Sequence, residues 1–249
     1  MEKIRIQVPA TSANCGPGYD TLGVACTLYN ELSFELLPPS AGLVLEASGE
    51  GKEYLVASEN NLVFKSFFSV WRAAQLSEVG LKISMQNNIP MSRGLGSSSS
   101  AIVAGVYAAN VLGGNRFSQD ELLNFATAIE GHPDNVAPAL LGGFTISYME
   151  GDKAHSLSFK PVLPLKLIAA VPEHKLATSL ARKAIPQEIK HTDAVFNVSR
   201  ASLLVATLMS GSGKHLATAL EDRLHQPYRA HLIPCLLYTS DAADEARSV

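Results

Sequence analysis

A run of glycine and serine residues at positions 90–100 has the composition of a phosphate-binding loop. It consists of Pro90, Met91, Ser92, Arg93, Gly94, Leu95, Gly96, Ser97, Ser98, Ser99 and Ser100. Glycines let the backbone approach a ligand closely, and the N–H groups at a helix start attract anions. Serine hydroxyls add hydrogen bonds, and one of them can ligate Mg²⁺. The segment therefore predicts a site for a phosphorylated ligand, in preference to a flexible loop with a serine cap.

The segment matches neither of two common nucleotide-binding patterns. Gly213 and Lys214 are the nearest match to the end of a Walker A loop. That loop would need a glycine five residues before Gly213, but Leu208 stands there. A dinucleotide-binding fingerprint would need glycine where the chain has Ser99. The phosphate site is therefore of another type.

Glu130 stands at the expected end of a helix, directly before Gly131. A carboxylate at a helix C-terminus opposes the helix dipole and costs about 0.3–1 kcal/mol. A position that lowers stability favours a functional role over that of an exposed surface glutamate. Asn135 follows in the same region, and an asparagine amide cannot act as a general base at neutral pH.

Three segments, in this order, resemble the GHMP kinase family and in particular its homoserine kinases. They are residues 9–23 (PATSANCGPGYDTLG), residues 90–100 and residues 130–143 (EGHPDNVAPALLGG), within a resemblance that runs from Lys3 to about Pro234. The resemblance implies an α+β fold with an N-terminal domain like domain 2 of ribosomal protein S5 and a ferredoxin-like C-terminal domain. It also implies ATP-dependent phosphorylation of the L-homoserine hydroxyl, the step before threonine synthase.

The resemblance also implies roles for individual residues. Residues 90–100 would bind ATP, and Ser98 and Glu130 would ligate a Mg²⁺ ion that bridges the ATP phosphates. The implied catalytic residues are Glu130, His132 and Asn135. The implied homoserine-binding residues are Asn14, Asp20, His132, Thr178, Arg182 and Arg229.

The substrate-binding residues each have a simpler alternative. Asn14 and Asp20 are common turn residues, although Asp20 would accept hydrogen bonds from the substrate ammonium group. Thr178 and Arg182 lie four apart on one face of an expected helix, and a guanidinium group suits a carboxylate. Arg229 is the expected second arginine for that carboxylate, and a solvent-exposed arginine is the alternative.

The implied mechanism is direct in-line attack of the substrate hydroxyl on the γ-phosphate of ATP. Since Asn135 stands where some relatives carry a catalytic aspartate, no general base is expected at this position. The hydroxyl proton would pass to the γ-phosphate or to solvent. Positioning and charge neutralisation would then supply most of the catalysis.

Hydrophobic periodicity predicts the elements that must hold these residues. Strands are expected at 4–8, 32–37, 43–47, 81–86 and 165–171, with a loop from Pro9 to Gly18 and a hairpin of 142–148 and 156–159. Helices are expected at 61–74, 97–112, 178–184, 192–209 and 216–223. A further helix begins with a capping box of Ser118 and Glu121 and ends at Gly131.

Composition limits the class of protein and its partners. The 249 residues are 47% hydrophobic and 17% charged, with a net charge of −3, which argues against nucleic acid as a main partner. The three cysteines form no C-x-x-C pair, and the N-terminus has no signal-like apolar stretch. Residues 101–112 are too short to span a membrane. These features favour a cytoplasmic protein. The partners that the resemblance implies are L-homoserine and ATP, and a homodimer is left open.

We expect two domains and a tail that is not native. The first domain covers 1–162, and the second covers 163–234 and is truncated. The tail covers 235–249, and its residues 235–245 resemble a translated sequencing adapter. The third glycine-rich motif of homoserine kinases, S-G-[AS]-G-P-[ST], is missing. We accordingly expect poor solubility and weak or absent activity of this chain.

Two other functions stay open on the sequence alone. One is a GHMP kinase for another small alcohol, such as a mevalonate-pathway intermediate. The other is a fragment that binds nucleotide without transferring phosphate.

Overall fold

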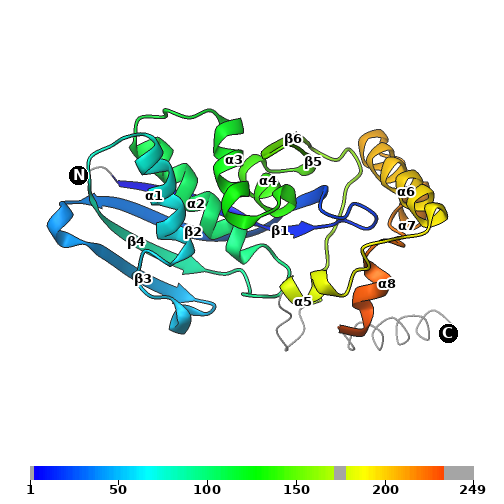
Figure 1. The fold of residues 1–249 in the computed structure, drawn as a ribbon, viewed down its shortest axis with the longest axis horizontal. Coiled ribbons are helices and arrows are strands. Elements are labelled where there is room, and N and C mark those ends of the chain that lie inside the picture. Colours follow the sequence, from blue (N-terminus) through cyan, green and yellow to red (C-terminus); the bar gives the residue numbers. More distant parts are fainter. Residues whose placement is uncertain (1–2, 171–177, 233–249) are drawn as a thin grey trace. The chain divides into compact units, whose positions relative to one another are not determined.

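The computed structural model describes residues 3–170 and 178–232 (Figure 1). Within these residues the chain divides into two units. The first unit comprises 3–13 and 20–160, and the second comprises 14–19, 161–170 and 178–232. The short segment Asn14–Tyr19 therefore belongs with the second unit, although both of its sequence neighbours belong to the first.

A six-stranded sheet forms the frame of the first unit. Its strands are β1 (Lys3–Ala13), β2 (Leu22–Leu37), β3 (Leu43–Gly49), β4 (Gly80–Asn87), β5 (Phe144–Glu150) and β6 (Lys153–Phe159). The strand order is β3-β4-β2-β5-β6, and β1 pairs with β2. The β3–β4 pair is parallel and the other pairs are antiparallel. The long β2 strand thus joins the two halves of the sheet.

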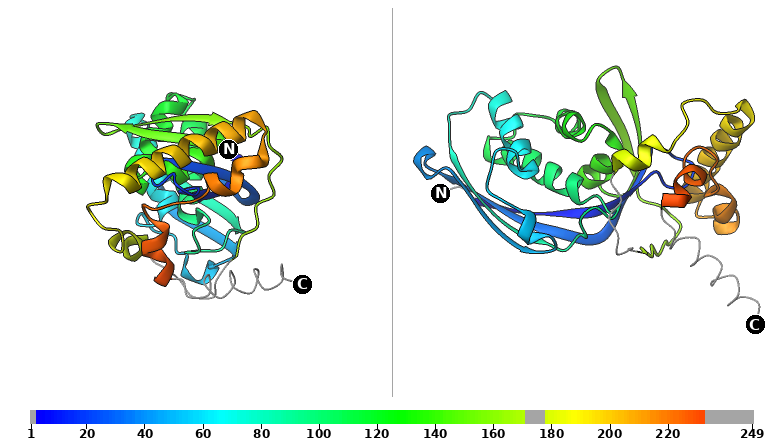
Figure 2. Two further views of the ribbon diagram at one scale, coloured as in Figure 1. Left: turned by 90° about the vertical axis from the view of Figure 1, so that its right-hand side faces the viewer. Right: turned by 60° about the horizontal axis from the view of Figure 1, so that its bottom comes forward.

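Four helices cover one face of this sheet (Figures 1 and 2). They are α1 (Leu62–Ala73), α2 (Ser97–Leu112), α3 (Gln119–Glu130) and α4 (Pro133–Leu141). The aromatic side chains of Phe34 on β2 and Phe64 and Phe67 on α1 are fully buried in the core between the layers. Burying apolar area of this kind is the main stabilising contribution to such a layered unit.

Local capping signals set the ends of two of these helices, α1 and α3. The Asn61 side chain accepts a hydrogen bond from the Val63 N–H at the start of α1. Ser118 and Glu121 form the expected capping box of α3, which ends at Gly131 in the left-handed conformation. The predicted helices at 61–74, 97–112 and 118–131 are therefore confirmed, as is the hairpin of β5 and β6.

Two expectations for the first unit are wrong. The predicted loop from Pro9 is strand as far as Ala13, because β1 continues along β2 with a register shift between Pro9 and Thr11. The expected elements also lack helix α4, which contains two prolines although proline usually argues against a helix. Here Pro133 occupies the first turn, where its missing N–H costs nothing, and Pro138 is accommodated inside the helix.

The described part of the second unit consists of helices and irregular segments. The helices are α5 (Thr178–Lys183), α6 (His191–Ser210), α7 (Leu216–Ala219) and α8 (Gln226–Arg229). Short 3-10 turns also occur in the two units, at Pro39–Ala41, Lys52–Tyr54, Gly213–His215 and Ala230–Leu232. Among all described residues, no helix is long and apolar enough to cross a membrane.

Two expectations for the second unit also need correction. The predicted strand at 165–171 is irregular over residues 165–170, because no strand among the described residues pairs with it, and Ile168 is 96% exposed. The helix expected at 216–223 ends at Ala219, since Asp222 instead binds other polar groups of the unit. Residue 171 and the tail at 235–249 lie outside the described residues.

The contact between α1 and α2 gives a test of the packing. Gly105 lies on α2, and a Cβ added there would be 2.5 Å from the Val63 carbonyl oxygen and 2.9 Å from the Phe67 backbone nitrogen. Alanine gains about 1 kcal/mol in helix propensity over glycine, but overpacking of this kind costs about 1–3 kcal/mol. We therefore expect Gly105→Ala to lower the free energy of unfolding measured in urea.

The matched control is Tyr107→Ala on the same helix, because Tyr107 is 44% exposed. It should change the free energy of unfolding by less than about 1 kcal/mol. A Gly105→Ala protein as stable as the wild type would contradict the close approach of the two helices.

Candidate functional site

The glycine–serine segment links β4 to α2 and ends at the first turn of that helix. Ser92, Gly94 and Gly96 all have positive φ angles, of 58°, 72° and 68°. Gly96 is the N-cap of α2, and a Cβ at this position would lie 2.0 Å from Thr11 Oγ1. Only glycine therefore lets the loop pass this close to β1. The first turn of α2 leaves N–H groups available for an anion.

Buried polar contacts fix this loop from both sides. The Thr11 N–H donates to the Leu95 carbonyl oxygen at 3.1 Å. Asn30, which is 1% exposed, donates from Nδ2 to Ser100 Oγ at 2.9 Å, and its Oδ1 accepts from the N–H groups of Asn88 and Ile89. The sequence analysis missed Asn30, because one more polar residue in a strand that also carries Glu31, Ser33 and Glu35 gives no distinct signal.

Glu130 links the end of α3 to the start of α2. It is the last residue of α3, and its Oε1 accepts hydrogen bonds from Ser98 Oγ and Ser99 Oγ, each at 2.9 Å. Ser99 is fully buried, whereas Ser98 is exposed. The two predicted metal ligands, Ser98 and Glu130, lie 32 residues apart in sequence and are thus brought together by α2 and α3.

The donor atoms of this cluster suit a hard divalent cation. All three side chains present oxygen, and Mg²⁺ is usually held by one or two protein oxygens together with phosphates and water. The part of the chain that the structure describes contains no group of three or more His, Cys, Asp or Glu side chains that could hold a metal. The Ser98–Glu130 pair therefore fits an ion shared with a phosphate ligand rather than one enclosed by protein.

His132 and Asn135 begin α4, directly after Glu130. His132 is the N-cap residue, and its Nδ1 lies 2.5 Å from Oδ1 of Asp134, whose side chain is 1% exposed. Because an ionised carboxylate only accepts, Nδ1 carries the hydrogen and the carboxylate fixes the imidazole ring. Asn135 Oδ1 accepts from Thr11 Oγ1 at 2.8 Å. Asp134 is a further residue that the sequence analysis did not assign.

The remaining predicted residues fall outside this cluster. Asn14 and Asp20 have positive φ angles of 65° and 56°, which asparagine and aspartate tolerate best after glycine. Asn14 belongs to the second unit and Asp20 to the first. Thr178 is the first residue of α5, and its side chain lies outside the described part of the structure.

The two predicted arginines contact the same aromatic ring in the second unit. Arg182 lies on α5 and Arg229 on α8, and the guanidinium carbons lie 5.6 Å and 5.0 Å from the ring centroid of Tyr19. Arg229 Nε also donates to the Ala181 carbonyl oxygen at 3.2 Å. The structure thus places Arg182 and Arg229, which lie 47 positions apart in the sequence, against the same ring.

A buried carboxylate organises the segment before α8. The fully buried side chain of Asp222 accepts hydrogen bonds from Asn197 Nδ2 and from the N–H groups of Leu224, His225 and Gln226. Burial by itself raises the pKa of the Asp222 carboxyl. The four hydrogen bonds outweigh it and hold this pKa below its ordinary value.

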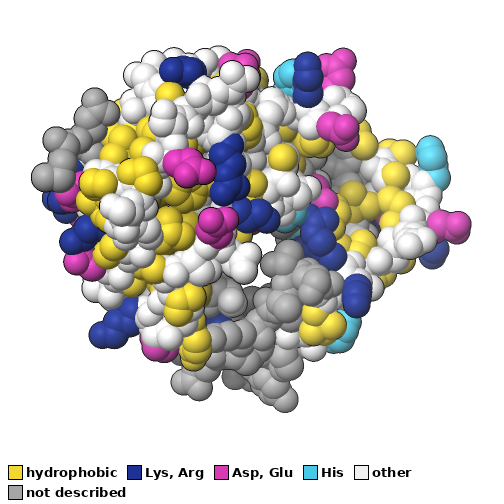
Figure 3. All heavy atoms as spheres, turned by 60° about the vertical axis from the view of Figure 1, so that its left-hand side comes forward, with side chains coloured by type: hydrophobic (Ala, Val, Ile, Leu, Met, Phe, Trp, Pro, Cys, Tyr) yellow, Lys and Arg dark blue, Asp and Glu magenta, His cyan; other side chains and the backbone are white. Residues whose placement is uncertain are grey.

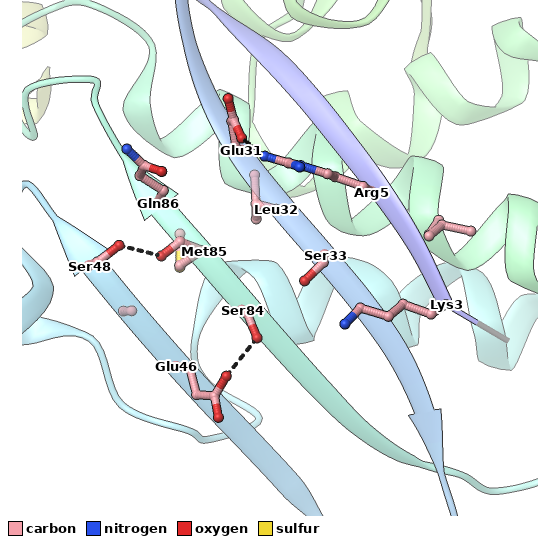
Figure 4. A pocket seen from close by; sticks show the side chains of 12 residues that line it. Lys3, Arg5, Glu31, Leu32, Ser33, Glu46, Ser48, Ser84, Met85 and Gln86 are labelled. Atoms are coloured by element: carbon pink, nitrogen blue, oxygen red, sulfur yellow. Dashed lines mark hydrogen bonds and ion pairs between the residues drawn. The ribbon is translucent and has the colours of Figure 1, made fainter. Parts of the chain in front are cut away.

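A shallow pocket of about 650 Å³ lies on the uncovered face of the sheet (Figure 4). Polar side chains from β1, β2, β3 and β4 line it, including Arg5, which pairs with Glu31, and Ser84, which donates to Glu46 at 2.8 Å. None of the predicted site residues lines this pocket. The pocket is therefore part of the polar outer surface of the sheet. Exposed ion pairs of this kind contribute little to stability.

Known proteins resemble this chain over almost its whole length. A model of the GHMP kinase N-terminal domain matches residues 61–143. The homoserine kinase of Carboxydothermus hydrogenoformans is 42% identical over 241 residues, which is 97% of this chain and 78% of that protein. The homoserine kinase of Clostridium beijerinckii is 44% identical over 232 residues, or 93% of this chain and 76% of that protein.

A solved structure gives the same match in three dimensions. The crystal structure of homoserine kinase from Cytophaga hutchinsonii superposes with a TM-score of 0.81 at 30% sequence identity. The match covers 99% of this chain and 80% of that chain. The chain therefore spans roughly three quarters to four fifths of the length of these relatives.

The Asp222 cluster predicts a dependence of stability on pH. Since the pKa of Asp222 is lower in the folded than in the unfolded state, its contribution is present at neutral pH and is lost as the pH falls below about 4. Asp222→Asn should lower the free energy of unfolding at pH 7 by at least about 2 kcal/mol, because hydrogen bonds to a charged group are lost. It should also flatten the acid branch of the stability profile measured by urea unfolding.

Glu188→Gln is the matched control, since Glu188 is an exposed acid of the same unit. We expect it to leave the profile within about 0.5 kcal/mol of the wild type. An Asp222→Asn protein with the stability and pH profile of the wild type would refute the role assigned to this carboxylate.

Proposed function

Because the chain belongs to the homoserine kinases of the GHMP kinase family, we propose that it transfers the γ-phosphoryl group of ATP to the hydroxyl of L-homoserine. The product is O-phospho-L-homoserine, an intermediate of threonine biosynthesis. The α+β GHMP kinase fold expected from the sequence is confirmed. The observation in the structure that carries the proposal is the pair of Ser98 and Glu130 at the start of α2, beside the glycine–serine loop.

Residues 90–100 are the proposed ATP-binding segment. The left-handed glycines keep side chains away from the ligand, and the N-terminus of α2 directs N–H groups and the positive end of its dipole toward the phosphates. Ser97 and Ser98 supply further donors. Ser99 and Ser100 are buried, so their support is structural.

Ser98 and Glu130 are the proposed holders of Mg²⁺. Their oxygen atoms fit this ion, and Ser98 is the exposed hydroxyl of the two serines that contact Glu130. When bound, Mg²⁺ neutralises charge that develops on the transferred phosphoryl group. The Glu130 carboxylate in turn orients Ser98 and Ser99 at the helix start.

His132 and Asn135 are proposed to position the acceptor. The hydroxyl oxygen of homoserine forms a bond to the γ-phosphorus, the bond from that phosphorus to the leaving oxygen of ADP breaks, and the hydroxyl proton passes to the γ-phosphate or to solvent. Asn135 cannot take up this proton, and its Oδ1 already accepts from Thr11. Catalysis therefore rests on orientation and charge stabilisation rather than on a general base.

The proposed substrate-binding residues match the two charges of an amino-acid alcohol. Arg182 and Arg229 would bind the carboxylate through their planar guanidinium groups. Asp20, with Asn14, would bind the ammonium group, and Thr178 would add a hydroxyl. Mevalonate carries a carboxylate but no ammonium group, so a site with both kinds of charge favours homoserine.

We propose the cytoplasm as the location and no nucleic-acid or membrane partner. The net charge of −3 argues against a nucleic-acid partner, and on the face shown in Figure 3 basic side chains lie beside acidic ones. A homodimer is left open. Sedimentation of the purified chain would measure its oligomeric state.

Substrate comparison tests the function itself. With ATP and Mg²⁺ present, we expect ADP release with L-homoserine and less than about a hundredth of that kcat/KM with mevalonate or shikimate, because unpaired charges in a site are costly. Coupled-enzyme measurement of ADP gives the rates. Preference for mevalonate, or nucleotide binding without any transfer, would contradict the proposal.

Replacement of Glu130 tests the proposed metal ligand. Glu130→Ala should lower kcat at least about 100-fold, because charge stabilisation at a reacting phosphate is lost. The KM for homoserine should change little. Asp120→Ala is the control, since Asp120 is an exposed acid in the first turn of the same helix. Unchanged transfer by Glu130→Ala would exclude the metal role.

A further inference from the structure

One aromatic ring contacts both arginines of the second unit. The guanidinium carbons of Arg182 and Arg229 lie 5.6 Å and 5.0 Å from the Tyr19 ring centroid. Arg182 also donates from Nη1 to the Tyr19 hydroxyl at 3.1 Å. The imidazole of His225 stacks on the same ring with centroids 5.3 Å apart and an angle of 29° between the planes. Tyr19 is therefore the common neighbour of these basic groups.

The backbone that carries Tyr19 is held by buried polar groups. His225, which is 5% exposed, lies with Nε2 2.7 Å from the Gly16 carbonyl oxygen. Asn197, which is 3% exposed, donates from Nδ2 to the Pro17 carbonyl oxygen at 3.2 Å and to Asp222 at 2.7 Å. The segment before Tyr19 is thus fixed by the same network that fixes the start of α8. The ring is a rigid support rather than a loose loop side chain.

Such a support has a clear physical effect on two arginines. Each guanidinium group gains a cation–π attraction to the ring, and each long side chain loses rotational freedom before any ligand arrives. Contact with the neutral phenol ring stabilises each guanidinium group, and the Ala181 carbonyl oxygen stabilises that of Arg229 as well. An incoming carboxylate then meets a preorganised pair and pays less ordering entropy on binding.

We propose that Tyr19 is a positioning residue, which holds Arg182 and Arg229 together for the carboxylate of the amino-acid substrate. The ring sets the separation of the two guanidinium groups, and the hydroxyl sets the orientation of Arg182. The inference rests on the proposed function, because that function assigns the carboxylate to these two arginines. It adds a residue that contacts the arginines and does not itself take part in phosphate transfer.

Two variants of Tyr19 separate the ring from the hydroxyl. Tyr19→Phe removes the hydrogen bond to Arg182 and should raise the KM for L-homoserine about fivefold, as expected for one lost hydrogen bond. Tyr19→Leu removes the ring as well and should raise this KM at least about tenfold. In both variants kcat and the KM for ATP should stay within about twofold of the wild type.

Tyr148→Leu is the matched control. Tyr148 also stacks on a histidine, His155, with centroids 5.1 Å apart, but it lies on the β5–β6 hairpin of the first unit. It should leave all kinetic constants unchanged. Thermal denaturation of each variant reports whether the fold is retained, and the Tyr19→Phe protein supplies the test if Tyr19→Leu does not fold.

A ligand without the carboxylate distinguishes positioning from general damage. 3-Aminopropan-1-ol keeps the ammonium and hydroxyl groups of homoserine, and its inhibition constant against homoserine measures binding at the same site. We expect this constant to be the same for the wild type and Tyr19→Leu, while the affinity for homoserine, measured by calorimetry, falls at least about tenfold. Equal losses for both ligands, or an unchanged homoserine affinity, would overturn the inference. A wild-type chain that neither binds nor phosphorylates homoserine would instead overturn the proposed function.

Discussion

The position of the glycine–serine loop in the first unit depends on the contacts of Thr11. Its N–H binds the Leu95 carbonyl, its hydroxyl binds Asn135, and its side chain fills the space that a Cβ on Gly96 would need. One buried residue near the end of β1 therefore joins the glycine–serine loop to the start of α4. These contacts are possible only because β1 stays paired with β2 beyond Pro9. The extension of β1 past Pro9 therefore also determines where the glycine–serine loop lies.

Elements whose signals are local were predicted from the sequence. The capping box at Ser118 and the glycine after Glu130 act within a few residues, and the helix between them was predicted at its observed ends. The strand through Thr11 was not predicted, because its pairing with β2 outweighs the turn preference of glycine, serine and asparagine nearby. The segment 165–170 fails in the opposite direction: its apolar residues favour a strand, but a strand needs a partner.

The candidate site shows the same division. Ser98 and Glu130 were identified from motif and helix position, and the structure brings them within hydrogen-bonding distance. Asn30, Asp134 and Asp222 were not identified, because each acts by binding groups that only the folded chain places beside it. Sequence reasoning identifies the residues of a motif more readily than the buried residues that hold them in place. The supporting residues are polar side chains that are buried, and this burial is visible only in the structure.

The electrostatic cost of Glu130 is smaller than its own helix suggests. At the C-terminus of α3 its carboxylate faces the negative end of that dipole, but the two serines that bind it lie in the first turn of α2, where the dipole is positive. The C-terminus of α3 thus destabilises the negative charge of Glu130, and the N-terminus of α2 stabilises it. A carboxylate beside a phosphate-binding loop would nevertheless repel the phosphates of a nucleotide. The same carboxylate becomes favourable once a cation lies between the two anionic groups, so its placement makes most sense when metal and nucleotide bind together.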